Sequence, residues 1–234
     1  MIRIIARDAR IEGAATRQEW EVVAEPGGHG VVSAHLVERL AELAGSVASR
    51  TAKEAVAPVS IDNLELVAPL KAGERLVVTA TLEPQRAPKL AVSLVARRAP
   101  KGPVAALAVM TFAGTSHAPP AVALPDGASR GSSPVTARFA AQPGDHLGAG
   151  NVLAWVQASA LLSAQGALGH RATFAGLGAL SVLEWLKGGE PLRLECSVVR
   201  ARHGELTVLS QLTNESTGST VLCALGHYRE GDGR

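Results

Sequence analysis

The chain has 234 residues, 47% of them hydrophobic and 19% charged, so it can bury one large core or two smaller ones. Aromatic residues make up only 3%, and the net charge of +2 comes from scattered basic residues, which argues against a nucleic-acid interface. Arg3, Arg7 and Arg10 interrupt the apolar core that a secretory signal needs, and we therefore expect a cytoplasmic protein.

The N-terminal part predicts two strands and then a helix. Residues 1–25 hold the strands, and a Pro-Gly-Gly break at 26–28 follows them. A helix is expected from Gly28 through Gly45, ending near Arg50, because its apolar residues recur at helical spacing. Those residues share one face of the helix and are Leu36, Leu40, Leu43 and Val47.

Four apolar segments follow the helix, at residues 61–70, 75–83, 89–98 and 104–113. The first two are joined by a Lys-Ala-Gly-Glu turn, and Pro58 suggests that the first strand begins no earlier than Ile61. One helix followed by hairpin-connected strands predicts an antiparallel sheet over the helix, which is an α+β fold. A shift to Pro, Gly, Ser and Ala predicts a linker at 114–134 between domains 1–113 and 135–234.

The sequence also repeats. Shifting the chain by 116 residues aligns residues 28–113 with residues 144–229 without a gap. The identical positions concentrate at one turn, where Lys71, Gly73 and Glu74 fall on a second Lys-x-Gly-Glu at 187–190. Two copies of one helix-and-sheet unit are the favoured interpretation, although two unrelated alanine-rich segments would also produce some matches.

The second copy predicts its own helix at 147–168. No charged residue lies between His146 and His170, which by itself suits a membrane span. Polar residues spread around the helix, and several glycines, argue against that span, so we expect no membrane contact. We expect a helix buried in protein and enclosed on more sides than the first.

Taken together, the order of these motifs resembles the hot-dog thioesterases. The motifs are a helix that opens with His-Gly, the strand pattern of Ser60, Asp62, Leu64 and Pro69, and the Lys-x-Gly-Glu turn. Two units in one chain resemble a double hot-dog acyl-CoA thioesterase. The resemblance implies a tandem hot-dog fold, with a long helix in each unit wrapped by an antiparallel sheet, and two units paired through their sheets. It implies an acyl-CoA or acyl-carrier thioester as substrate, and a homo-oligomer of such chains is compatible with it.

Thioester hydrolysis needs hydrogen-bond donors that point at the carbonyl oxygen, and the first turn of a helix offers unpaired N–H groups. Small residues there let a substrate approach the backbone. The candidate substrate-binding residues are Gly30, Ser33 and Ala34 in the first copy and Gly148 and Gly150 in the second. His29 and His35, with Asn151 in the second copy, lie near the same helix starts, where they would either cap the helix or contact the acyl carbonyl.

The resemblance also implies a carboxylate about two turns into the helix, acting on water or on the thioester. In the first copy that position is Ala41, with Glu42 next to it; in the second it is Gln157. Glu42 is therefore a candidate base, or a solvated helix carboxylate. Gln157 is a candidate water-orienting amide, or an amide that is bonded between the units.

Asp62 is the second candidate base, because its strand resembles the one that supplies the catalytic Asp in the acyl-CoA thioesterase II family. That family has the Asp in the second unit, where this chain has Gly178. The unequal copies predict at most one working site per chain.

Neither a metal nor a cofactor is expected. Cys196 and Cys223 form no metal-ligand or disulfide pattern and are predicted to be buried thiols. No G-x-S-x-G elbow, Walker loop or dinucleotide fingerprint is present. Two other functions remain open: an enoyl or 3-hydroxyacyl thioester hydratase, since 144–146 reads Gly-Asp-His, and a non-catalytic acyl-binding protein.

Overall fold

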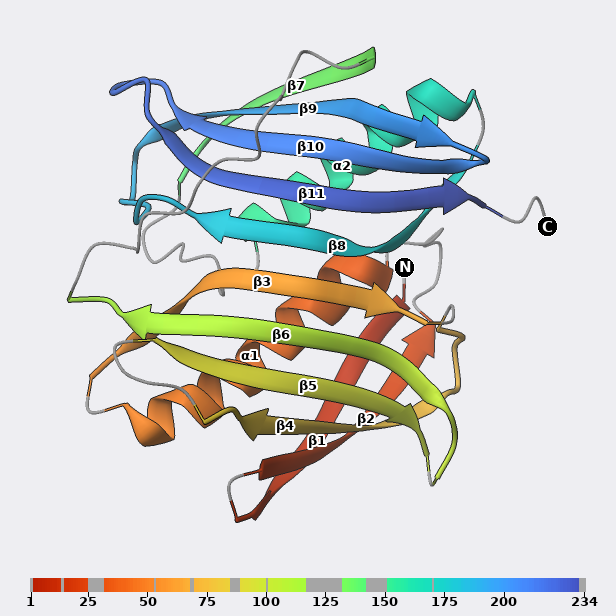
Figure 1. Cartoon of the computed structure of the whole chain (residues 1–234), viewed down its shortest axis with the longest axis vertical. Coiled ribbons are helices and arrows are strands. Elements are labelled where there is room, and N and C mark those ends of the chain that lie inside the picture. Colours follow the sequence, from red (N-terminus) through yellow and green to blue (C-terminus); the bar gives the residue numbers. More distant parts are fainter. Residues whose placement is uncertain are drawn as a thin grey trace. The chain divides into compact units, whose positions relative to one another are not determined.

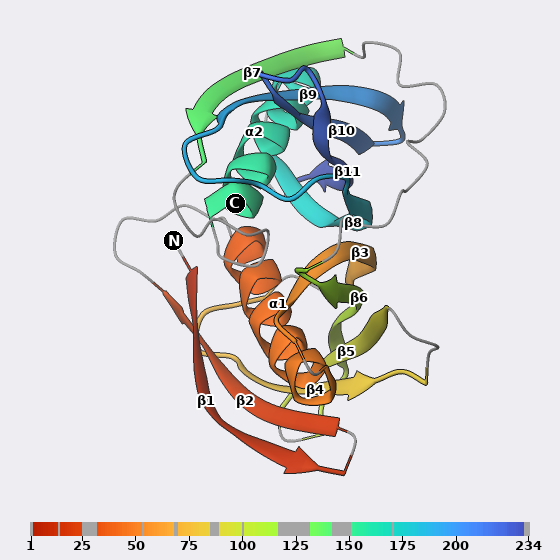
Figure 2. The same ribbon diagram turned by 90° about the vertical axis from the view of Figure 1, so that its left-hand side faces the viewer.

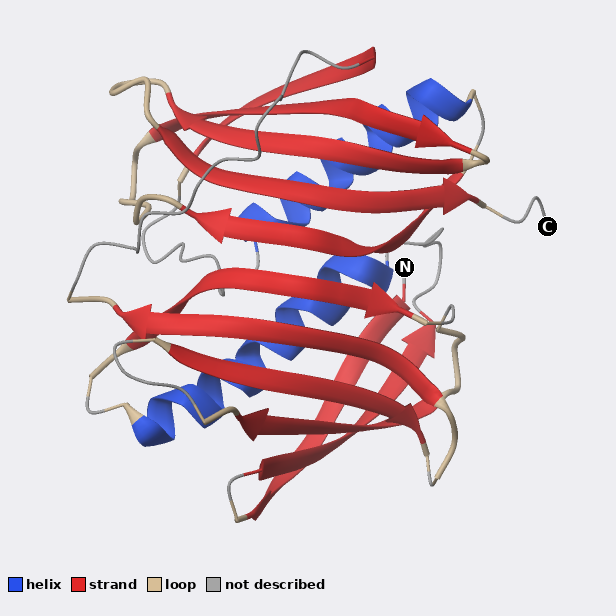
Figure 3. Ribbon diagram, in the orientation of Figure 1, coloured by secondary structure: helices blue, strands red, loops and turns tan. Residues whose placement is uncertain are grey.

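The computed structural model describes residues 2–13, 15–24, 32–52, 54–67, 70–84, 89–99, 101–116, 132–141, 151–169 and 171–231. It divides into two compact units, Met1–His117 and Ala118–Arg234. Within the described residues each unit consists of antiparallel strands and one helix (Figure 3).

The first unit is a six-stranded antiparallel sheet with a helix against it. Its elements are β1 (Ile2–Glu12), β2 (Ala15–Ala24), α1 (Val32–Thr51), β3 (Val56–Leu66), β4 (Arg75–Leu82), β5 (Leu90–Arg98) and β6 (Val104–Gly114). The strand order is β1-β2-β4-β5-β6-β3, and α1 contacts all of these strands (Figure 1). The sheet curls around the helix, with β1 and β2 on one side of α1 and β3 on the other (Figure 2).

The second unit has five strands in its described part. Its elements are β7 (Ser132–Ala140), α2 (Asn151–Leu168), β8 (Ala172–Val182), β9 (Pro191–Arg202), β10 (Glu205–Asn214) and β11 (Thr220–Glu230). The strand order is β8-β11-β10-β9-β7, all antiparallel, with α2 against β7 to β11. This order repeats that of the first unit without a counterpart to β1 among the described strands.

Equivalent strands of the two units are separated by a constant number of residues in the sequence. β8 and β11 begin and end 116 residues after β3 and β6. The Lys-x-Gly-Glu turn recurs with its hydrogen bonds: Lys71 N donates to Glu74 Oε2 at 3.1 Å, and Lys187 N donates to Glu190 Oε2 at 3.0 Å. Both turns need a glycine because the backbone φ at Gly73 and Gly189 is 84° and 85°.

The apolar stripe of the first helix forms the core that the sequence predicted. Leu36, Leu40, Leu43 and Val47 are all at most 5% exposed, and they face the sheet of their unit. The opposite side of the same helix carries charged residues, among them Arg39 and Glu42, which form an ion pair. α1 is therefore an ordinary amphipathic helix with one face in the core and one in solvent.

Two expectations about these elements are wrong. The first strand after α1 begins at Val56 rather than at Ile61, and Pro58 lies inside it. The sheet accommodates the proline because the β3–β6 register shifts between Pro58 and Ser60, so the missing N–H falls at an irregularity in the ladder.

The second helix is not enclosed on more sides than the first. Trp155 and Leu162 on α2 are 43% and 57% exposed. The absence of charge in this helix therefore does not mark a helix surrounded by protein. It marks a helix with one apolar face in the core and another apolar face in solvent.

Strand β7 ends the sheet of the second unit. In the first unit the equivalent strand, β2, pairs with β1 on its outer side; no described strand pairs with the outer side of β7. Pro134 lies in β7, where its register with β9 shifts between Ser132 and Val135. A proline fits at an edge because no ladder hydrogen bond is lost there.

Candidate functional site

The most informative pair of positions is Ala41 in α1 and Gln157 in α2, which lie 116 residues apart. Each is 3% exposed and therefore buried. In α1 this position is filled by a methyl group. In α2 it holds a primary amide, so the second unit has a polar group where the first has none.

The amide of Gln157 has no hydrogen-bond partner in the described part of the chain. Both Nε2 and Oε1 are fully buried. A buried amide that gives up water without gaining a partner costs about 1–3 kcal/mol. Such a cost is typical of a group that a bound molecule or an ordered water satisfies during function.

Gln157 lies on the same helix as a candidate carbonyl-binding terminus. α2 begins at Asn151, and six residues of helix separate the two by about 9 Å along the axis. The first turn of α2 has no acidic residue, so that turn itself supplies no carboxylate to neutralise the positive end of the helix dipole. The first turn of α1 has none either.

The structure does not describe all of the predicted site residues. His29, Gly30, Gly148 and Gly150 fall outside the described residues. Ser33, Ala34 and Asn151 lie in the first turns of α1 and α2, but only their backbone is described. For these residues, a role in the site remains a prediction from the sequence.

Glu42 and His35 face away from the sheet of the first unit. The carboxylate of Glu42 is 45% exposed and accepts a hydrogen bond from Arg39 Nη1 at 2.6 Å. His35 Nδ1 lies 3.1 Å from Glu38 Oε2 on the same helix. These are intrahelical i,i+3 pairs, which are common on solvated helix surfaces.

Asp62 lies on the other side of the same unit. Its neighbour Ile61 is buried in the core, and Asp62 alternates to the outer face of β3, where it is exposed and accepts a hydrogen bond from Ser60 Oγ at 3.1 Å. The strand then bulges at Asn63, whose φ is 53°. The first unit therefore does not bring Asp62 and Glu42 together, since its helix and its sheet lie between them.

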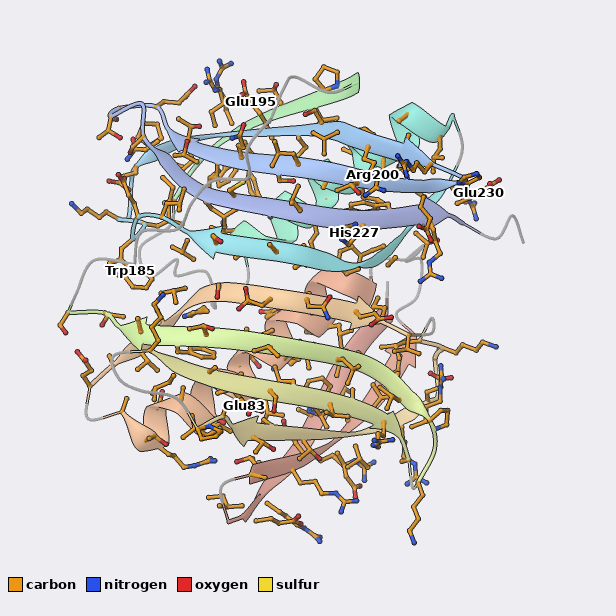
Figure 4. All side chains as sticks on the ribbon, viewed as in Figure 1. Glu83, Trp185, Glu195, Arg200, His227 and Glu230 are labelled. Atoms are coloured by element: carbon orange, nitrogen blue, oxygen red, sulfur yellow. The ribbon has the colours of Figure 1, made fainter. Side chains whose placement is uncertain are left out.

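In the second unit, the position equivalent to Asp62 is a glycine with a histidine beside it. Gly178 on β8 has no side chain, and a Cβ placed there would lie 2.6 Å from Nε2 of His227. His227 extends from the exposed side of β11 (Figure 4), and its Nδ1 lies 3.4 Å from Thr207 Oγ1. His227 carries no local signal in the sequence, because only the β8–β11 pairing places this imidazole over the glycine.

The interior of the second unit is more polar than that of the first. Cys196 Sγ lies 3.2 Å from Ser210 Oγ, and Tyr228 is buried close by. Burial raises the pKa of Cys196 and of Cys223 to about 11, so both thiols stay protonated at neutral pH. The prediction of buried thiols is confirmed. A neutral, buried thiol is a poor nucleophile. Among the described residues, Gln157 is the one side chain whose donor and acceptor are both buried without a partner; Arg39 and Arg193 each leave only the Nε unpartnered.

The described residues offer no other competing site of this kind. They contain no group of three or more His, Cys, Asp or Glu that could hold a metal ion. A surface hollow of about 330 Å³ lies on the β1–β2 hairpin and is lined by Arg7, Arg10, Glu12, Arg17 and Glu19, none of which is a predicted site residue. Neither of the described helices is long and apolar enough to cross a membrane.

Comparison with known sequences gives no assignment, since no family model and no curated protein sequence matches the chain. Solved structures do match. The tesB protein of Mycobacterium avium subs. paratuberculosis has a TM-score of 0.67 at 15% identity, over 96% of each chain. The 12:0-ACP thioesterase of Umbellularia californica has a TM-score of 0.70 at 10% identity, over 93% of this chain and 94% of that chain.

A conserved protein from Alicyclobacillus acidocaldarius, described as having a hot-dog fold, has a TM-score of 0.66 at 13% identity, over 97% of each chain. At identities of 10% to 15% these likenesses establish the fold and leave the chemistry open. The resemblance that the sequence motifs indicated is borne out: the solved structures that match include acyl thioesterases, and the chain has the hot-dog fold.

Proposed function

We propose that each of the two units is one hot-dog unit and that the chain hydrolyses an acyl thioester, carried by coenzyme A or by an acyl carrier protein. The buried amide of Gln157, which has no hydrogen-bond partner among the described residues, carries this proposal. Two of the solved structures of like fold support it, because one is a 12:0-ACP thioesterase and the other a tesB protein.

In the proposed mechanism the two functional groups of α2 have different roles. Backbone N–H groups in the first turn of the helix donate to the thioester oxygen and stabilise the negative charge that develops on it. Gln157 accepts a hydrogen bond from water with Oε1 and donates one to the substrate with Nε2, which satisfies both buried atoms at once. Water then attacks the carbonyl carbon, and the thiol leaves with a proton.

The general base is proposed to be a carboxylate, Glu42 or Asp62. Both are exposed and both keep a hydrogen-bonding partner in the structure, Arg39 and Ser60 respectively. α2 itself contains no Asp or Glu, so its own side chains provide an amide but no base. Variants Glu42→Gln and Asp62→Asn separate the two candidates.

The test is a panel of saturated and enoyl-CoA substrates, with free thiol and enoyl absorbance followed separately. Hydrolysis releases thiol, and Gln157→Leu should lower kcat by about 100-fold, the usual effect of removing one polar group that contacts the transition state. Gln165→Leu is the matched control, because it makes the same change on the same helix at a partly exposed position. It should leave kcat unchanged.

Other results of the same assay would identify one of the alternative functions. Enoyl loss without thiol release identifies a hydratase, and binding of acyl-CoA without any reaction identifies a non-catalytic acyl-binding protein. Full thiol release by Gln157→Leu would contradict the role of Gln157. Full thiol release by both carboxylate variants would contradict the proposed base and leave the thioesterase assignment standing.

A further inference from the structure

The β1–β2 hairpin, at one edge of the first unit's sheet (Figure 2), carries a hollow with charged walls. We name it the β1–β2 hollow; its volume is about 330 Å³, and it is lined by Arg7, Arg10, Glu12, Arg17 and Glu19, all of them exposed. Small-molecule sites begin at about 300 Å³. Because every lining residue is charged, the hollow suits an ionic or strongly polar solute and does not suit an acyl chain.

A β-bulge brings two of the arginines to the same face of the hairpin. On a regular strand, side chains three residues apart point to opposite faces, as Arg7 and Arg10 would. The β1–β2 register shifts between Ala6 and Ala9, and Arg7 and Arg10 both line the hollow. Bulges re-aim side chains in this way and are frequent beside functional sites.

The bulge is supported from the buried side of the hairpin. Gln18 Nε2 donates to the backbone carbonyl oxygen of Arg7 at 2.6 Å. Trp20, which is 1% exposed, donates from Nε1 to Gln18 Oε1 at 2.8 Å. The guanidinium of Arg7 also has a partner, since its Nη2 lies 3.2 Å from Glu21 Oε2. Both the backbone and the side chain of Arg7 are therefore positioned before a ligand binds, which lowers the entropy lost on binding.

The other two arginines form an unfavourable pair in the free protein. Arg10 and Arg17 lie directly opposite each other on the two strands. Like charges at such positions destabilise a hairpin. In the described part of the chain, no ion pair joins either guanidinium to Glu12, to Glu19 or to another carboxylate. An anion held by both guanidinium groups would remove the repulsion, and phosphate matches their geometry.

We propose that the β1–β2 hollow binds a sugar phosphate. Arg10 and Arg17 hold the phosphate through charge-assisted hydrogen bonds, and Arg7 adds to the positive wall. Glu12 and Glu19 are acceptors only, so the ligand has to present hydroxyl groups to them beside its phosphate. A free sugar phosphate and the ribose phosphate of a nucleotide share this chemistry. Binding at this hollow does not depend on thioester hydrolysis.

Isothermal titration calorimetry of the full chain with ribose 5-phosphate tests the proposal. We expect a Kd of about 0.1 mM or lower at low ionic strength. The double variant Arg10→Gln, Arg17→Gln should weaken binding about 30-fold or more, because it removes both charged donors. Arg97→Gln is the matched control: it makes the same change at an exposed position of β5 outside the hollow, and the Kd should not change.

Recognition of the hydroxyl groups has its own test. Inorganic phosphate should bind about 10-fold more weakly than ribose 5-phosphate, because it cannot reach the glutamates with hydroxyl groups while the arginines hold its oxygens. The double variant Glu12→Gln, Glu19→Gln should narrow this difference, since amides do not repel a bare anion.

A third ligand distinguishes the two sources of a sugar phosphate. Tight binding of adenosine 3′,5′-bisphosphate, with competition by coenzyme A, would assign the hollow to a nucleotide. Preference for ribose 5-phosphate would assign it to a free sugar phosphate.

Thermal unfolding provides the folding control. Without ligand, the Arg10→Gln, Arg17→Gln variant should unfold about 1–3 °C higher than the wild type, because the like-charge pair is gone. Weaker binding by this variant would then not result from misfolding.

Three outcomes would overturn the proposal. One is the absence of binding for all three phosphates up to about 5 mM. Another is an unchanged Kd for ribose 5-phosphate in the double arginine variant. The third is a wild-type chain that binds phosphatidylglycerol vesicles but no ribose 5-phosphate, with vesicle binding lost in that variant, which would assign the arginines to a membrane surface.

Discussion

Replacing the amide of Gln157 should raise stability and lower activity. Replacing it with leucine removes two buried polar atoms that have no partner in the described part of the chain. We expect Gln157→Leu to raise the free energy of unfolding by about 1–3 kcal/mol in the absence of substrate, even as it lowers activity. Urea unfolding followed by circular dichroism measures the gain.

Gln165→Leu is again the control, with an expected change within about 0.5 kcal/mol, because its side chain keeps access to water. A loss of stability in Gln157→Leu would show that the amide already has a partner in the free protein. The residue would then be structural rather than held ready for substrate.

The buried thiols make a prediction about pH. The pKa of Cys196 and of Cys223 is about 11 in the folded chain, above the value of about 9.0 for a free thiol. The unfolded chain therefore loses these protons first as the pH rises, and the folded state loses stability between about pH 9 and 11. Below pH 9 both states keep the protons and this contribution is complete.

The slope should reach about 1.4 kcal/mol per pH unit for each thiol. Chemical unfolding at pH 8, 9, 10 and 11 measures it, and the variants Cys196→Ala and Cys223→Ala should each flatten the curve. Unchanged slopes in both variants would place the alkaline loss elsewhere, for example on Tyr228, whose pKa is also raised by burial.

At the scale of an element, the two Lys-x-Gly-Glu turns provide a matched pair. Gly73 and Gly189 have positive φ, and a Cβ at either would contact nothing within 4 Å. Gly73→Ala and Gly189→Ala should therefore each cost about 1 kcal/mol or more through backbone strain alone. Equal losses in thermal unfolding would support this cause, and a neutral substitution at either position would contradict it.

Helix α1 offers a change of the opposite sign. Gly45 lies inside the helix, and a Cβ there would meet Phe112 at an ordinary contact distance of 3.5 Å. Gly45→Ala should stabilise the protein by about 0.5–1 kcal/mol, because alanine loses less backbone entropy on forming a helix. Thermal unfolding of Gly45→Ala and Gly73→Ala in the same experiment should show a gain of stability in the first variant and a loss in the second.

These elements also show what the sequence could predict. The spacing of Leu36, Leu40, Leu43 and Val47 identified the buried face of α1, because helical periodicity is local information. The start of β3 was missed, because a proline ends a strand by local rules and is tolerated only through the β6 register. The exposed face of α2 was missed for a similar reason: an uncharged helix has the same sequence whether protein or solvent lies against it.

The candidate site was predictable in part. The offset of 116 residues aligns Gln157 with Ala41 in the sequence, and both positions are buried. The sequence could not show that the amide lacks a described partner, that Glu42 pairs with Arg39, or that His227 covers Gly178. Each of these depends on side-chain placement across strands or around a helix.

For the whole molecule, the outer side of β7, with which no described strand pairs, bears on solubility. A strand with unpaired backbone groups is a template on which another chain can add, and this is a route to ordered aggregates. Pro134 removes one donor from that row and accompanies a break in register, and the exposed Arg138 adds a charge. β7 is therefore protected by its own sequence, whereas its counterpart β2 is protected by β1.

That protection gives β7 a role in keeping the folded protein dispersed. Pro134→Val would restore a donor and a β-branched residue at the edge, with little expected change in the unfolding midpoint. Light scattering and thioflavin fluorescence during prolonged incubation should rise sooner for this variant than for the parent chain. An unchanged lag time would mean that one proline is not the barrier, and the slow loss of soluble protein would then have to begin from another strand.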